Sequence, residues 1–212
     1  NMHVIDSHTE GEPTRVLIEG LPDLGGGTVA EQAKYFSQNY DHVRRALMLE
    51  PRGSDVLVGA FLVPPSHPTA QFGVVFVNNA GILGMCVHGT IGVIRTLKHL
   101  SRIDPSSEVI LETPVGLVKA CERPDSSITV ENVASYRSAT KVPVQLTDRT
   151  VHADIAWGGN WFALVEDHGE HLVPERIPEL TAISTAIRTV MNTQGLHGDT
   201  GDPIDHVELF GA

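Results

Sequence analysis

The sequence predicts a strand-rich α+β protein, and three observations support this class. First, 20 Gly and 13 Pro among 212 residues indicate many short elements joined by tight turns. Second, aromatic residues make up only 5% of the chain, so Val, Ile, Leu and Ala must fill the core. Third, short apolar runs bounded by turn residues outnumber helical patterns. Since 41% of the chain is apolar, these elements can bury at least one core.

The predicted β-strands are runs that are alternately or continuously apolar and that have turn residues at both ends. By this criterion strands occupy residues 3–7, 14–19, 56–63, 72–77, 108–112, 116–122, 128–133, 142–146, 151–157, 161–165 and 206–210. Strands therefore dominate the chain, and most of those after residue 108 follow one another without an intervening helix.

Three segments carry the helical period instead. Thr28 and Glu31 form a capping-box pattern, and apolar side chains at alternating steps of four and three predict one amphipathic helix that continues to Leu47. A second helix is predicted over 178–192, with Pro near its first turn. The third predicted helix follows Cys86.

The pattern of elements also predicts two halves. Pro, Ser and charged residues interrupt it near 123–127 and again near 136–141. We therefore expect a first α/β half at 1–125 and a second at 126–212. The sequence stops at 210–212, directly after a predicted strand, which suggests that the second half is incomplete and the chain truncated at its C-terminus.

Charge and cysteine content exclude several classes of protein. Fifteen Lys and Arg against 26 Asp and Glu leave a net charge of −11, which repels nucleic-acid phosphates and anionic membranes. The apolar stretches are well short of the ~20 residues that cross a bilayer. Cys86 and Cys121 are too few for the disulfide framework of a small secreted domain, and we expect free thiols. These features predict a soluble, cytoplasmic protein with no nucleic-acid or membrane partner.

The segment around Cys86 is the richest in chemistry. An apolar strand runs into a Gly-rich turn and then into a helix that begins at or next to Cys86. The unpaired N–H groups and the dipole of a helix N-terminus favour a thiolate, so Cys86 is expected to exchange a proton near neutral pH. The N–H groups of Val87, His88 and Gly89 can hold a substrate carboxylate. A lone cysteine is more often a small buried hydrophobic residue, and this reading is assigned to Cys121 in mid-strand.

The surroundings of Cys86 distinguish it from such a cysteine. Gly81, Gly84, Gly89 and Gly92 are expected to let backbone come close to a ligand, although His88 alone can equally be a capping or solvated side chain. Elsewhere the Asp- and His-rich stretch 197–206 fits neither a calcium loop nor a zinc-binding helix, so we favour a hydrated turn and expect no metal site.

Two arginines remain open to interpretation. Arg15 and Arg52 can clamp a carboxylate, or they can be structural ion-pair partners of Glu12 and Asp55.

Five blocks of the sequence resemble the successive blocks of the proline racemase family, in order along the whole chain. The most specific is Met-Cys-Val-His-Gly-Thr, which begins at Met85. Within the family, the bacterial 4-hydroxyproline 2-epimerases are the most similar. The blocks lie at 5–15, 51–55, 79–92, 157–162 and 205–211.

The resemblance implies a fold and an activity. The fold has two similar α/β halves, as in diaminopimelate epimerase, with the active site in the cleft between them. The activity is inversion at Cα of 4-hydroxyproline without a cofactor, from the trans-L to the cis-D form. Because such inversion removes a proton on one face and returns one on the other, two acid/base groups must flank the carbon. Cys86 matches the family's first acid/base, Val87, His88 and Gly89 match its carboxylate site, and His206 matches a histidine near the bound substrate.

The chain departs from the family at two places. Val87 stands where the family usually has glycine, and it is expected to crowd the carboxylate site. The block Asp-x-x-x-Cys-Gly-Thr-Gly, which supplies the second acid/base in relatives, does not occur between His206 and Ala212. Cys121 lacks the glycines and the helix start of that block and is no substitute. We therefore expect the 212-residue chain to bind weakly and not to invert its substrate.

Several alternatives stay open. A trans-3-hydroxy-L-proline dehydratase of the same family keeps the first cysteine but replaces the second, which lies in the missing block. A proline racemase of the family is also an alternative, because the absent block would have to distinguish it. An inactive fragment that only binds small carboxylates is a further alternative, and its exposed apolar surface would favour self-association, for example as a homodimer. A thiol hydrolase would instead need Cys86 to be activated by a histidine and acylated.

Overall fold

The computed structural model describes residues 1–104 and 107–211 and has two compact units, Asn1–Val133 and Ala134–Ala212. The predicted α+β class is confirmed. The boundary expected at 125/126 falls inside the first unit, because β8 (Ile128–Glu131) pairs with β7 (Gly116–Glu122) of that unit. Ala212, the last residue of the expected abrupt end, lies outside the described residues.

The first unit is built on a mixed sheet. Counted over the described residues, this sheet has eight strands in the order β1-β2-β3-β4-β6-β7-β8, with β5 paired to β4. The pairs β2–β3 and β4–β6 are parallel and the others antiparallel. The predicted strands of this unit are present, with small shifts at their ends. They are β1 (His3–Thr9), β2 (Glu12–Glu19), β3 (Val58–Val63), β4 (Phe72–Val77), β6 (Val109–Thr113), β7 and β8, and β5 (Ile82–Leu83) was not predicted.

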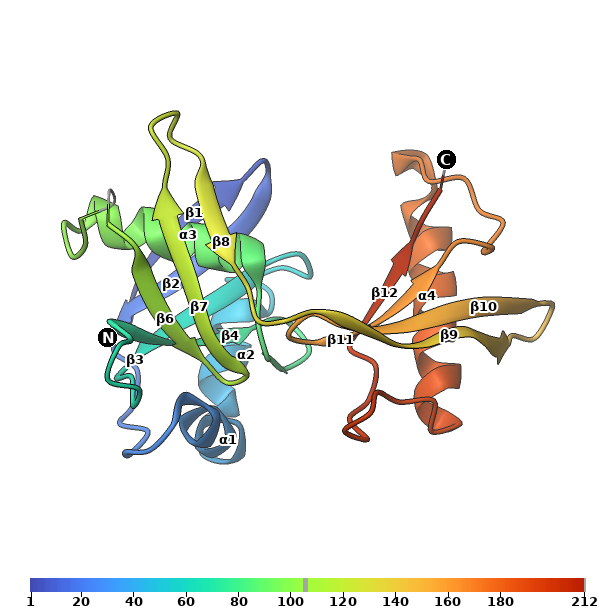
Figure 1. Ribbon diagram of the computed structural model, residues 1–212, viewed down its shortest axis with the longest axis horizontal. Helices are drawn as coiled ribbons and strands as arrows, with labels where there is room; N and C mark the ends of the chain where they lie inside the picture. The colour runs from blue at the N-terminus through green and yellow to red at the C-terminus, as the bar shows by residue number, and fades with distance from the viewer. Residues whose placement is uncertain (105–106, 212) are drawn as a thin grey trace. The chain divides into compact units, whose positions relative to one another are not determined.

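Helices cover both faces of this sheet, so its central strand is apolar on both sides (Figure 1). On β4, Val74 and Phe76 pack with the cluster that includes α3 (Val87–His99), whereas Val75 and Val77 pack with α1 (Val29–Asn39) and α2 (Asp41–Met48). The alternation follows from the two-residue period of a strand. It places α3, and Cys86 directly before it, on one face of the sheet.

The prediction of a single helix that continues to Leu47 is wrong, because the helix is interrupted at Tyr40. Tyr40 leaves helical geometry at φ −130° and ψ 18°, and its N–H closes α1 by donating to the carbonyl of Phe36 at 2.7 Å. A new helix starts at Asp41. The predicted apolar face is nevertheless kept across the break, because Phe36 and Leu47 are both buried in the same cluster.

Gly92 allows α3 to lie directly on β2. A Cβ atom at Gly92 would lie 2.8 Å from Cβ of Thr14, which is fully buried. We expect Gly92→Ala to lower the free energy of unfolding by about 1–2 kcal/mol, because the strain of overpacking exceeds the gain in helix propensity. Urea denaturation measures this, with Gly26→Ala as control because no atom lies within 4 Å of its added Cβ. A Gly92→Ala variant as stable as the control would contradict this packing.

The second unit packs one helix on a smaller sheet. Over the described residues it has four strands in the order β12-β11-β10-β9, of which only β11–β12 is a parallel pair. The buried side of the sheet packs against α4 through Ile183, Ile187 and Met191 (Figure 1). The elements are β9 (Tyr136–Gln145), β10 (Thr150–Trp157), β11 (Trp161–Val165), the 3-10 helix η1 (Pro174–Arg176), α4 (Ile177–Thr193) and β12 (His206–Leu209).

Strand β9 begins earlier than the predicted strand at 142–146. Lys141 has a positive φ of 52°, and the pairing with β10 shifts register between Ala153 and Ile155. This irregularity interrupts the apolar alternation and hides the first half of the strand from sequence patterns. No helix within residues 1–104 and 107–211 is long and apolar enough to cross a bilayer.

Candidate functional site

Cys86 is the N-cap residue of α3, so the predicted helix start at this cysteine is confirmed. Its backbone is extended, with φ −146° and ψ 116°, and its carbonyl accepts the first intrahelical hydrogen bond from the N–H of Thr90 at 2.9 Å. The N–H of Gly89 points at the sulfur, with a distance of 3.3 Å from N to Sγ. The thiol thus takes the place that a Ser or Asp side chain occupies at other helix N-termini.

The chain reaches Cys86 through a tight turn. The side-chain oxygen of Asn78 accepts hydrogen bonds from the N–H groups of Ala80 and Gly81, both at 2.9 Å. Strand β5 then returns antiparallel to β4, and Met85 is buried in the core beside α3. The sulfur is therefore held by a fixed turn on one side and by a helix on the other.

Burial changes the expected acidity of Cys86. Loss of solvent raises the pKa of this thiol above its ordinary value, and the nearby Glu12 carboxylate acts in the same direction. Hydrogen bonds from the N–H groups of Gly89 and His88 oppose this effect but do not overcome it. The expectation that Cys86 titrates near neutral pH is therefore wrong, because desolvation outweighs the helix terminus.

His88 lies beside the sulfur of Cys86, whereas Val87 faces solvent. His88 is half-buried, and its Nδ1 lies 3.4 Å from Sγ of Cys86. Nε2 of His88 is buried and has no hydrogen-bond partner among the described residues. Val87, by contrast, is 45% exposed in the first turn of α3.

Gly89 and Gly92 lie in close packing contacts, and the ligand approach expected of them stays a prediction. A Cβ at Gly89 would lie 2.8 Å from the ring of Phe76 and 3.2 Å from Sγ of Cys86. Thr14 occupies the space where a side chain at Gly92 would stand. A Cβ at Gly81, by contrast, would have no atom within 4 Å. The close approach that these glycines permit is therefore mainly between α3 and the sheet.

His206 lies in the second unit, at the start of β12 opposite Phe162 of β11. Its ring stacks on that of Phe162, with centroids 4.9 Å apart, and its Nδ1 is buried with no hydrogen-bond partner among the described residues. Asp205 fixes the strand, since its carboxylate accepts from the N–H of Trp161 at 3.0 Å. The expected place of His206 beside a substrate stays a prediction.

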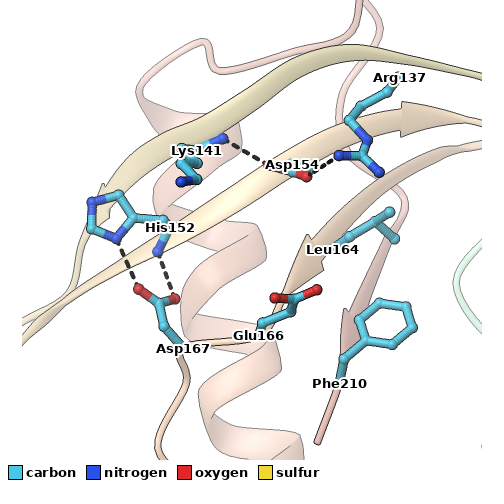
Figure 2. Close-up of a pocket in the computed structure, with 8 residues that line it drawn as sticks. All are labelled: Arg137, Lys141, His152, Asp154, Leu164, Glu166, Asp167 and Phe210. Carbon is cyan, nitrogen blue, oxygen red and sulfur yellow. Dashed lines mark hydrogen bonds and ion pairs between the residues drawn. The ribbon is translucent and has the colours of Figure 1, made fainter.

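A groove of about 710 Å³ in the second unit was missed from the sequence (Figure 2). It runs along strands β9 to β11, and its charges are paired in part: Arg137 with Asp154 at 2.9 Å, and Nδ1 of His152 with Asp167 at 2.8 Å. Its polar residues alternate with buried ones on β10, a pattern that sequence analysis treats only as the solvent side of a strand. The groove is lined by Arg137, Lys141, His152, Asp154, Leu164, Glu166, Asp167 and Phe210, none of which was a predicted site residue.

The remaining candidates have structural surroundings. Arg15 pairs with Asp6 at 2.8 Å rather than with Glu12, and Nε of Arg52 donates to the carbonyl of Ala46. Both cysteines are free, as predicted, and Cys121 faces Thr129 across β7 and β8. In the part of the chain that the structure describes, no three His, Cys, Asp or Glu side chains gather where they could hold a metal ion.

Comparison with known sequences gives consistent results. The family model described as proline racemase matches residues 4–212. A 4-hydroxyproline epimerase of Burkholderia pseudomallei is 52% identical over 99% of this chain and 68% of its own length. A 4-hydroxyproline 2-epimerase of Acinetobacter baumannii is 50% identical over 98% of this chain and 67% of its own length. The chain thus spans about two thirds of the relatives it matches.

Solved structures share the fold. A probable proline racemase from Agrobacterium radiobacter, crystallised with bound carbonate, has a TM-score of 0.88 and 24% identity, over 99% of this chain and 66% of that one. A hydroxyproline epimerase from Agrobacterium vitis, with bound trans-4-hydroxy-L-proline, has a TM-score of 0.83 and 26% identity, over 91% of this chain and 60% of that one. The fold that the resemblance implied is therefore confirmed.

Proposed function

The chain belongs to the proline racemase family, and from this premise we propose that Cys86 is the acid/base on one face of Cα in the epimerisation of 4-hydroxyproline. The reaction converts trans-4-hydroxy-L-proline to cis-4-hydroxy-D-proline and needs no cofactor. The observation that carries the proposal is the position of Sγ, at the N-cap of α3 and 3.3 Å from the N–H nitrogen of Gly89.

The helix terminus suits the substrate as well as the sulfur. The carboxylate of an imino acid is attracted to the N–H groups and the positive dipole end at a helix start, and the N–H groups of Val87 and His88 are the first in α3. A carboxylate bound there brings its Cα next to the sulfur. Abstraction then breaks the Cα–H bond, the proton passes to the Cys86 thiolate, and the electron pair is delocalised into the carboxylate.

Inversion requires a second proton donor on the opposite face. We propose that this group lies in sequence other than these 212 residues, because Cys121 is held in the β7–β8 pair and does not stand at a helix start. The chain is then expected to exchange the Cα proton with solvent and to return it on the same face. His206 is proposed to contact the bound substrate.

Incubation with trans-4-hydroxy-L-proline in deuterium oxide tests this function. Proton NMR should show loss of the Cα–H signal, while chiral chromatography should show that the L configuration is kept. Exchange should rise with pH, since burial raises the pKa of Cys86 and the base is its thiolate. If no exchange occurs at any pH from mildly acidic to mildly basic, the chain is an inert fragment and the proposal fails.

Val87 is proposed to restrict access to the carboxylate site. Its side chain is 45% exposed at the position where the family usually has glycine. Val87→Gly is expected to tighten binding of trans-4-hydroxy-L-proline about tenfold, the effect of one misfitting methylene group in a binding pocket. NMR titration measures the dissociation constant. Val56→Gly, which removes an exposed valine elsewhere in the same unit, should leave it unchanged. Equal affinities for Val87→Gly and the parent chain would contradict this role.

A further inference from the structure

Arg44 makes a buried link between α2 and the turn before Cys86. Only 6% of this arginine is exposed. Its Nε and Nη2 bind both carboxylate oxygens of Asp41, at 2.6 and 3.0 Å. Its Nη1 donates to the carbonyl oxygens of Asn78 and Asn79, at 3.0 and 2.7 Å. All three guanidinium nitrogens therefore donate hydrogen bonds, and Nη1 donates to the turn that begins at Asn78.

The turn at Asn78–Gly81 depends on such a link. Apart from those with Arg44, the hydrogen bonds of this turn are mostly internal. The side-chain oxygen of Asn78 accepts from the N–H groups of Ala80 and Gly81, and the backbone N–H of Asn78 donates to the carbonyl of Gly81 at 2.9 Å. Asn79 also donates from its side-chain nitrogen to the carboxylate of Asp55, at 3.2 Å. Nη1 of Arg44 is a donor that the carbonyls of Asn78 and Asn79 share, so it ties both residues of the turn to α2.

The position of the turn in space also determines the position of Cys86. Strand β5 follows directly and has two pairs with β4, Val77 with Ile82 and Phe76 with Leu83. Gly84 and Met85 then lead to Cys86. A two-residue strand contributes little stability of its own, so its position depends on the turn that starts it.

We propose that Arg44 is a positioning residue for the reaction: by clamping the carbonyls of Asn78 and Asn79 it keeps Cys86 at the N-terminus of α3. This inference rests on the proposed function for its catalytic meaning, but the position of the sulfur can be measured without any turnover. Arg44 touches neither the sulfur nor the proposed carboxylate site, so it acts through the turn and β5.

The test is the rate at which iodoacetamide alkylates Cys86, measured against pH by mass spectrometry of the peptide so that Cys121 is followed separately. In Arg44→Met the turn loses its clamp and the sulfur becomes more accessible to solvent. We expect alkylation of Cys86 at neutral pH to accelerate about tenfold, because the turn loses both hydrogen bonds from Nη1 of Arg44. Its pH midpoint should fall toward that of a free thiol, because burial is what raises the pKa of Cys86.

The chain offers a closely matched control in Arg15. This arginine also binds both oxygens of one carboxylate, that of Asp6, and also donates to two carbonyls, those of Leu47 and Arg52. It does not touch the turn. Arg15→Met is therefore expected to lower stability without changing the midpoint for Cys86, which separates positioning from a general loss of stability.

A second variant covers the case in which Arg44→Met does not fold. Arg44→Lys keeps a charge for Asp41 but lacks the fork that reaches both carbonyls, so it should show a smaller shift in the same direction. The proposal is overturned if the folded Arg44 variant has the same Cys86 midpoint as the parent chain, or the same as Arg15→Met. Absence of deuterium exchange with hydroxyproline in the parent chain would overturn the proposed function and leave this result intact.

Discussion

Replacement of Cys86 by alanine is expected to reduce exchange of the Cα proton of trans-4-hydroxy-L-proline by about 10²- to 10⁴-fold, the usual contribution of one positioned acid/base group. The physical reason is that, in the proposed mechanism, Sγ of Cys86 at the N-cap of α3 accepts the proton. The measurement is the decay of the Cα–H signal in deuterium oxide for the two chains at equal concentration.

Cys121→Ala is the matched control for this prediction. It removes the second free thiol, which is also half-buried and lies on β7 of the same unit. Cys121→Ala should exchange the Cα proton at the same rate as the parent chain. Exchange that persists in Cys86→Ala, or that disappears in Cys121→Ala, would assign the chemistry to another group.

Glu112→Gln is expected to lower the free energy of unfolding by about 3 kcal/mol. The substitution replaces one of the two carboxylate oxygens by an NH2 group, so some of the surrounding N–H and O–H donors lose their acceptor. Glu112 is 7% exposed. It accepts from the N–H and the hydroxyl of Ser66, at 2.6 and 2.8 Å, and from the N–H groups of His67 and Val29, at 2.8 and 3.3 Å. It thereby joins β6 to the start of α1 and to the loop after β3.

Urea denaturation at neutral pH measures this loss. Glu131→Gln serves as the control, because Glu131 is exposed on β8 and pairs with Lys119 only at 3.6 Å. Its removal should change stability by less than about 0.5 kcal/mol. If Glu112→Gln were as mild as the control, the carboxylate would contribute nothing to joining these elements.

The same carboxylate predicts a dependence of stability on pH. Burial alone would raise the pKa of Glu112, but the hydrogen bonds from His67, Ser66 and Val29 outweigh it and hold this pKa below its ordinary value. A group whose pKa is lowered on folding stabilises the protein above its unfolded pKa, about 4.3 for Glu, and this contribution is lost as pH falls through the folded value. The difference in stability between the parent chain and Glu112→Gln should therefore shrink below about pH 4.

Much of the fold could be predicted because its elements are local. The capping box at Thr28 and the helix start at Cys86 depend on a few neighbouring residues, and both are present. The break at Tyr40 was missed because the apolar period continues across it. The division between the units was placed too early, since a turn at Ser126 has the composition of a linker but joins two paired strands.

The candidate site could be predicted only in part. The place of Cys86 followed from its sequence neighbours, whereas its raised pKa depends on burial by residues far along the chain and on Glu12. The clamp by Arg44 joins residues whose numbers differ by more than thirty, so no spacing in the sequence reveals it. The groove in the second unit arises from one face of three strands, which a single sequence does not identify as a site.

Two titrations on the same chain decide whether the Cys86 thiolate is the base. The rate of Cys86 alkylation and the rate of Cα deuterium exchange of trans-4-hydroxy-L-proline are each measured across the same pH range. If the Cys86 thiolate is the base, both rates follow one midpoint, above that of a free thiol because burial raises the pKa of Cys86. If the two midpoints differ, so that the rate of deuterium exchange reaches its maximum at a pH where alkylation of Cys86 is still slow, Cys86 is not the base.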